Sequence, residues 1–97
     1  MEIRVQSIKF NADQKLLDYV DKKVARLEKF DDRITSVEVA LALMEKPDNK
    51  SAKIQAHVPG ENLVIERTAR TFEEAITECV DLMKEKMVRN REKRNNE

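Results

Sequence analysis

The chain has 97 residues, 40% of them hydrophobic and 39% charged, and its 19 Lys and Arg balance 19 Asp and Glu. This length predicts a single domain, residues 1–97, with one modest core. No apolar run approaches the roughly 20 residues that a membrane helix needs, and the N-terminus lacks the apolar segment of a signal peptide. We therefore expect a cytoplasmic protein without a membrane partner. The single cysteine, which cannot form an internal disulfide, agrees with that compartment.

The N-terminal residues 2–10 read as a first strand. Ile3 and Val5 share one of its faces, whereas Ile8 and Phe10 are out of phase with them. Either a bulge near Gln6-Ser7 or an early end of the strand would explain this change of phase.

A first helix is predicted over residues 12–30. Asn11 resembles its N-cap, because Gln14 follows three residues later as in a variant capping box, and the pair Asp31-Asp32 ends it. On a helical wheel its cations form one narrow stripe that includes Tyr19: Lys15, Lys22, Arg26 and Lys29. An apolar stripe on the opposite side must face a core: Leu17, Val20, Val24 and Leu27. A row of cations on one solvent face is a surface that a phosphate backbone can use.

Three further strands follow the first helix. Residues 34–44 and 51–58 alternate between apolar and polar positions, as half-buried strands do. Their inward positions are Val37, Val39, Leu41 and Leu43 in the first, and Ala52, Ile54, Ala56 and Val58 in the second. Residues 62–69 form a fourth strand, whose phase stays open because Val64 and Ile65 are adjacent.

A long second helix begins after Thr71, which forms a TxxE capping box with Glu74. Its apolar face follows helical spacing and consists of Phe72, Ile76, Cys79, Met83 and Met87. The pattern fades after Val88, so residues from about 93 are expected to fray.

The predicted order is therefore β-α-β-β-β-α. The first crossover should be parallel and right-handed, and the next three strands antiparallel. Because the sheet has one apolar face, both helices must cover it, which gives an α+β two-layer sandwich with a four-stranded mixed sheet. The C-terminal part resembles a double-stranded-RNA-binding domain, to which this chain adds an N-terminal strand.

The sequence offers no catalytic constellation. His57, the only histidine, falls on an outward strand position, and Cys79 fits a small core residue. General acid–base and nucleophilic catalysis need such groups held together in a cleft. A zinc site needs several Cys or His ligands, and Gly60 alone cannot form a phosphate-cradling loop. We therefore expect no enzyme activity, no metal, no cofactor and no small-molecule substrate.

A second basic segment lies at the end of the second helix. Residues 84–94 hold Glu85, Glu92 and six cations: Lys84, Lys86, Arg89, Arg91, Lys93 and Arg94. One or two cations would complement the helix dipole, so six exceed that requirement. Each basic segment alone is equally well explained as solvated helix surface, but two on neighbouring helices favour a polyanion. Because the open sheet face lacks aromatic side chains for base stacking, structured RNA fits better than a single strand.

Four segments form a co-linear set along the chain. They are residues 25–30 (ARLEKF), Pro59-Gly60, residues 71–76 (TFEEAI) and the basic segment 84–94. In this order they resemble the ribosome hibernation promoting factor and ribosome-associated inhibitor family, which carries an A-K-L-E-K-aromatic run at the end of its first helix. No single motif is specific, but the set covers nearly the whole chain, and the family has the fold predicted above.

The resemblance implies a non-enzymatic protein that binds the small ribosomal subunit through ribosomal RNA. It would block the channel for messenger and transfer RNA and inhibit translation in stationary phase or starvation. The implied RNA contacts are Lys22, Lys23, Arg26, Lys29, Lys84, Lys86, Arg89, Arg91, Lys93 and Arg94, and Lys15 joins them from the helical wheel alone. A separate factor for ribosome dimerisation is a further candidate partner.

Two features qualify the resemblance. Arg70 stands where the family often has an acidic residue, so it either contacts RNA or pairs with Glu73 or Glu74. The chain ends at residue 97, which points to the short form of the family, without the C-terminal dimerisation domain of the long form. An alternative function stays open: a protein–protein interaction module whose charged helices bind an acidic partner or a second copy of the chain.

Overall fold

A computed structural model describes residues 1–45 and 47–95, with side chains as far as Glu92. Its elements are β1 (Glu2–Ile8), α1 (Gln14–Ala25), the 3-10 helix η1 (Arg26–Lys29), β2 (Ser36–Leu43), β3 (Lys50–Val58), β4 (Glu61–Ala69) and α2 (Phe72–Asn95). Apart from η1, this is the predicted order.

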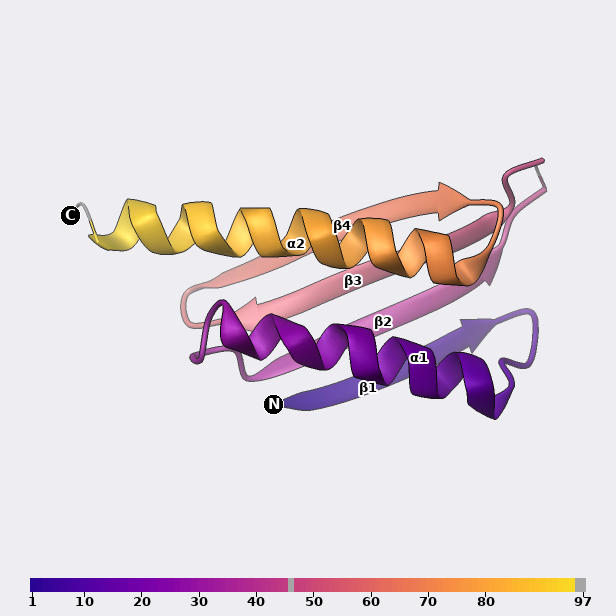
Figure 1. The fold of residues 1–97 in the computed structure, drawn as a ribbon, viewed down its shortest axis with the longest axis horizontal. Coiled ribbons are helices and arrows are strands. Elements are labelled where there is room, and N and C mark those ends of the chain that lie inside the picture. Colours follow the sequence, from indigo (N-terminus) through magenta and orange to yellow (C-terminus); the bar gives the residue numbers. More distant parts are fainter. Residues whose placement is uncertain (46, 96–97) are drawn as a thin grey trace.

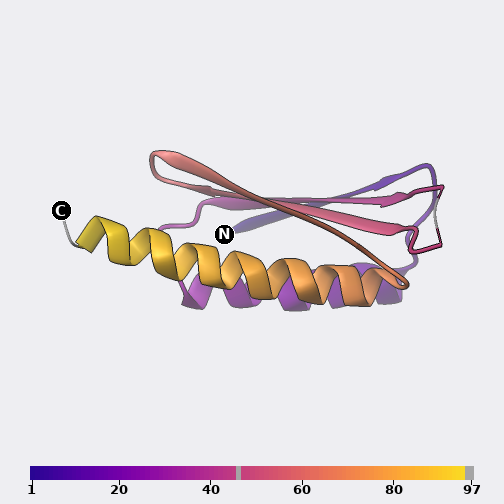
Figure 2. The same cartoon turned by 90° about the horizontal axis from the view of Figure 1, so that it is seen from above.

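The four strands form one sheet in the order β1-β2-β3-β4. β1 pairs with β2 in parallel, and the other two pairs are antiparallel. Both helices lie on the same face of this sheet (Figure 2). They run side by side in the same direction (Figure 1). The C-terminal half of α1 therefore lies beside a part of α2 that is well past the first turn of α2. The predicted α+β two-layer sandwich is confirmed.

The core lies between the helices and the inner face of the sheet. Every residue of the predicted apolar face of α2 is buried there, as are the predicted inward positions of β3. In β2 the prediction holds for Val37, Val39 and Leu41, but Leu43 is 39% exposed, because it ends the strand where the β2–β3 loop begins. β4 buries Leu63 and leaves Val64 38% exposed, which settles its phase.

The first helix begins later than predicted. Its N-cap is Asp13, not Asn11, and the Asp13 carboxylate accepts a hydrogen bond from the backbone N–H of Leu16 at 2.8 Å. The buried stripe consequently starts at Leu16 and not at Leu17, which is only half-buried. Leu16 lies four residues before Val20, the spacing that places two side chains on one helix face.

The first strand ends early and contains no bulge. Its pairing with β2 is continuous as far as Ile8 opposite Ala42, and Lys9 then adopts a left-handed backbone with φ of 65°. Phe10 lies beyond the strand, and its ring stacks on that of Phe72 at a centroid distance of 4.7 Å. This contact ties the β1–α1 loop to the start of α2.

The start of α2 is capped as predicted. The Thr71 hydroxyl accepts a hydrogen bond from the backbone N–H of Glu74 at 3.1 Å. The helix is regular to Asn95, past the position where fraying is expected; fraying itself stays a prediction.

Candidate nucleic-acid interface

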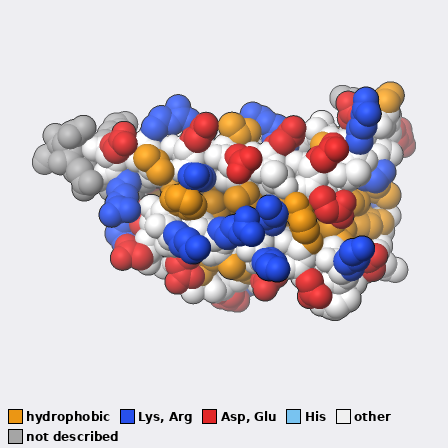
Figure 3. Space-filling view, viewed as in Figure 1, with side chains coloured by type: hydrophobic (Ala, Val, Ile, Leu, Met, Phe, Trp, Pro, Cys, Tyr) orange, Lys and Arg blue, Asp and Glu red, His pale blue; other side chains and the backbone are white. Residues whose placement is uncertain are grey.

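A groove of about 200 Å³ lies between η1 and α2. We call it the basic groove and define it by the residues that line it: Lys23, Arg26, Lys29, Phe30, Thr77, Val80, Asp81 and Lys84. Four of these eight side chains are cations and one is an acid, although the whole chain has a formal net charge of zero. Space-filling shows Lys and Arg side chains gathered between the two helices on this face (Figure 3).

The short 3-10 helix aligns the cations on the α1 side. A 3-10 helix has three residues per turn, so side chains three positions apart eclipse one another. Arg26 and Lys29 have this spacing in η1, and Lys23 precedes Arg26 by the same interval. Leu27 is fully buried between them and fixes η1 to the core. The sequence-predicted single helix over residues 12–30 missed this tightening.

α2 divides its cations between two sides. Lys84 lines the basic groove, and Arg91, seven residues further on, reaches the backbone carbonyl of Phe30 with its Nη1 at 3.5 Å. Lys86 turns toward β4, where its Nζ lies 3.4 Å from the carbonyl oxygen of Val64. Arg89 is exposed beside Val88 in a second hollow, to which η1 contributes no residue.

The remaining predicted contacts lie outside the basic groove. Lys15 and Lys22 are exposed on α1 but do not line it. The side chains of Lys93 and Arg94 fall outside the described residues. The structure therefore brings Lys23, Arg26, Lys29 and Lys84 together at one place, with Arg91 at its edge.

Aromatic rings hold two of the groove cations. The Nζ of Lys84 lies 4.9 Å from the centroid of the Phe30 ring, and the Nζ of Lys23 lies 5.6 Å from that of Tyr19. Both distances are within the range of cation–π attraction. The sequence placed Tyr19 in the predicted basic stripe. It predicted no separate role for Phe30, which it identified only as the last residue of the A-R-L-E-K-F run.

None of the four groove cations forms an ion pair with a described residue. The ion pairs of the described residues lie elsewhere: Arg4–Glu2, Arg33–Asp31, His57–Glu38 and Arg70–Asp48. Asp81 lines the groove but forms no ion pair with a described cation. Within the described part of the chain no direct ion pair therefore engages the four cations, and the lining keeps four cations against one acid.

The charge of the same inter-helix surface changes from positive to negative toward the start of α2. An adjoining hollow is lined by Tyr19, Thr77 and three acids: Glu73, Glu74 and Glu78. Tyr19 and Thr77 thus mark the boundary between a cationic and an anionic region. A polyanion is attracted to the first region and repelled by the second, so the surface defines where it can bind.

Arg70 does not pair with Glu73 or Glu74, so that part of the sequence interpretation is wrong. Its Nε instead lies 3.8 Å from Oδ1 of Asp48, in the β2–β3 loop, and both side chains are well exposed. Such a pair contributes little to stability.

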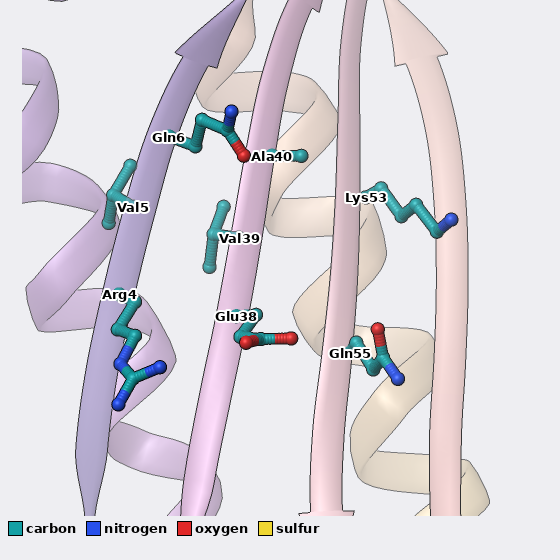
Figure 4. Close-up of a pocket in the computed structure, with 8 residues that line it drawn as sticks. All are labelled: Arg4, Val5, Gln6, Glu38, Val39, Ala40, Lys53 and Gln55. Carbon is teal, nitrogen blue, oxygen red and sulfur yellow. The ribbon is translucent and has the colours of Figure 1, made fainter.

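The opposite face of the sheet is polar and mixed in charge. A hollow of about 340 Å³ on this face is lined by Arg4, Gln6, Glu38, Lys53 and Gln55 together with small or apolar residues (Figure 4). Cations and a carboxylate alternate across it, and no aromatic side chain is among its lining residues. This hollow therefore offers neither a stacking platform nor a region of one charge.

The candidate reactive groups are far from a catalytic arrangement. On the open sheet face, His57 contacts Asn62 through Nδ1 at 2.7 Å and Glu38 through Nε2 at 3.4 Å. Cys79 is fully buried, and burial raises the pKa of its thiol to about 11. Within residues 1–45 and 47–95, no three His, Cys, Asp or Glu side chains are placed to hold a metal, and no helix is long and apolar enough to cross a membrane.

Comparison with known proteins gives consistent matches. The family model of the Sigma 54 modulation protein / S30EA ribosomal protein matches residues 3–95. A ribosome hibernation promoting factor from Azotobacter vinelandii is 30% identical over 95 residues, covering 96% of this chain and 85% of that protein. The crystal structure of the N-terminal domain of Thermus thermophilus Protein Y superposes with a TM-score of 0.81 at 29% identity, covering 92% of this chain and 98% of that domain. A ribosomal subunit interface protein from Coxiella burnetii shares the fold, with a TM-score of 0.86 at 12% identity over 94% of this chain and 98% of that one.

Proposed function

The chain belongs to the Sigma 54 modulation protein / S30EA ribosomal protein family, and on that premise we propose that it binds the small ribosomal subunit through ribosomal RNA. The bound protein blocks the channel for messenger and transfer RNA and inhibits translation in stationary phase or starvation, which amounts to ribosome hibernation. It acts in the cytoplasm, by occupancy and without catalysis.

The observation that carries this proposal is the basic groove. Four cations and one acid line it on a chain whose formal net charge is zero, and none of the four cations forms an ion pair with a described carboxylate. Phosphate groups are the natural counter-charge, because Lys and Arg that neutralise phosphates release condensed counterions from the nucleic acid. Arg26 adds a planar guanidinium that can donate two parallel hydrogen bonds to one phosphate.

The rigidity of the groove favours structured RNA over a flexible strand. Its cations stand on α1, η1 and α2, which pack on one sheet, so the spacing of their backbone attachment points is set before binding. A folded RNA presents phosphates at fixed positions and can match such a spacing. The flanking cations complete the proposed contact set: Lys15, Lys22, Lys86, Arg89, Arg91, Lys93 and Arg94.

Sedimentation through a sucrose gradient tests the proposal. Purified protein mixed with purified small subunits should sediment with them, and should return to the top of the gradient when ribonuclease digests the RNA. Protein that sediments with a heavy fraction of a stationary-phase extract after the same digestion would instead have an acidic protein partner. Protein that stays at the top with intact subunits at low salt would overturn the proposal.

A further inference from the structure

We infer that Phe30 is a positioning residue for RNA binding, because its ring holds the ammonium group of Lys84 over the basic groove without neutralising it. The inference rests on the proposed function, since it assigns a role within the same site. Phe30 follows η1 directly and lines the groove on the side opposite Lys84.

Two contacts join Phe30 to the basic end of α2. The Nζ of Lys84 lies 4.9 Å from the ring centroid, and Nη1 of Arg91 lies 3.5 Å from the backbone carbonyl oxygen. Phe30 is itself half-buried against the hydrophobic core, and its backbone N–H donates to the carbonyl of Leu27 at 3.0 Å. The ring is therefore a fixed support, whereas a lysine side chain on a helix surface is free to sample many rotamers.

The chemistry of the ring explains why an aromatic residue suits this position. The negative face of its quadrupole attracts a cation, but the ring carries no net charge. A carboxylate in the same place would also orient Lys84, but it would repel a phosphate and cancel the charge that binds it. The ring thus restricts the lysine before binding and leaves its charge available, which lowers the entropy lost on association.

The use of aromatic residues in this chain supports the inference. The chain contains one Tyr and three Phe. Phe10 and Phe72 stack on each other in the core layer, whereas Tyr19 and Phe30 each lie beneath a lysine of the basic groove. Both aromatics outside the Phe10–Phe72 pair therefore serve the same surface.

The inference is tested in the whole chain with Phe30→Leu, which keeps an apolar side chain but removes the ring, and Phe30→Tyr, which restores it. Phe30→Leu should weaken binding to purified small subunits about two- to fivefold, the range of an exposed cation–π contact. It should also reduce the slope of log affinity against log salt concentration, by up to the contribution of one phosphate contact. Phe30→Tyr should return both quantities to wild-type values. A purely structural role would lower the melting temperature without changing the salt dependence at temperatures where the variant is folded.

A double-mutant cycle assigns the effect to Lys84. In a Lys84→Met background, Phe30→Leu should cause no further loss, whereas in a Lys86→Met background its full effect should remain, because Lys86 points toward β4. If Phe30→Leu keeps wild-type affinity and salt dependence, or has an equal effect in both backgrounds, the role inferred for Phe30 is overturned. The proposed function is not affected by either result.

The NMR signals of the free protein separate this inference from the proposed function. The ε-methylene protons of Lys84 should be shifted upfield by the Phe30 ring current, and Phe30→Leu should abolish the shift without any RNA present. Absence of the shift in the wild-type chain would overturn the inference whatever the chain binds. Failure of the wild-type chain to bind small subunits would overturn the proposed function, and with it the role assigned to Phe30 in binding.

Discussion

The hydroxyl groups of Tyr19 and Thr77 lie 2.9 Å apart and form a hydrogen bond that links α1 to α2. The bond sits at the boundary between the cationic and the anionic region of the inter-helix surface. It therefore fixes the relative position of the two helices where their charge changes sign.

Replacing Tyr19 with Phe should lower the free energy of unfolding by about 1 kcal/mol, because it removes the hydroxyl and leaves that of Thr77 without this partner. Urea denaturation followed by circular dichroism measures the change. Thr77→Val should have a similar effect, and the double variant should lose less than the sum of the two. Strictly additive losses would show that the two hydroxyls do not stabilise each other.

Reversing the charge of Lys22, Arg26 and Lys29 to Glu should abolish sedimentation with small subunits. All three side chains are exposed, so the fold should persist. The matched control reverses Lys9, Lys53 and Arg70, which are also exposed and lie outside the basic groove, with the same change in net charge. A folded variant with Lys22, Arg26 and Lys29 reversed that binds like the control would show that total charge, and not the position of these cations, governs binding.

Binding should weaken steeply as salt rises. For contacts to single-stranded or duplex nucleic acid, the logarithm of affinity falls with the logarithm of salt by about 0.7–0.9 per neutralised phosphate. Several contacts should therefore cost orders of magnitude between about 50 and 200 mM salt. Titrations at four or five salt concentrations give the slope. A slope near zero would indicate an apolar protein partner in place of RNA.

The stability of the fold should fall at alkaline pH because of Cys79. Burial raises the pKa of its thiol from 9.0 to about 11, so the unfolded chain loses this proton at a lower pH than the folded chain does. The corresponding stability is fully present below pH 9 and is lost as the pH rises from about 9 to about 11. Lysines and tyrosine also titrate there, so the measurement compares wild type with Cys79→Ala. The wild-type chain should lose more free energy of unfolding between pH 8 and pH 10.5 than the variant does.

The periodic parts of the fold could be predicted from the sequence, because burial imposes a repeat on them. The inward residues of β3 alternate, the buried face of α2 follows helical spacing, and Thr71 precedes Glu74 as a cap should; all three predictions are confirmed. The family assignment is confirmed as well. The start of α1 was misplaced because Asn11 and Asp13 are both good caps, and the choice depends on which of them lets Leu16 reach the core.

The candidate site could be predicted only in part. A helical wheel sorts the cations of one helix, but it cannot show which side of that helix a second helix will approach. In α2, Lys84 and Arg91 face one side and Lys86 faces the other, and this distribution of cations depends on how α2 lies on the sheet. The roles of Phe30 and Thr77 likewise arise from tertiary contacts. The contribution of each predicted contact residue to RNA binding stays a prediction.

The parallel pairing of β1 with β2 has a consequence for the order in which the chain assembles. The turns that join β2, β3 and β4 are short, whereas Glu2 meets Ser36 only after all of α1 and η1 have been enclosed in the connecting loop. Closing a long loop costs more chain entropy than closing a hairpin, and non-local pairing slows folding. The three-stranded meander should therefore gain protection from hydrogen exchange before β1 does in pulse labelling during refolding. The first strand of the sequence is then the last to join the sheet.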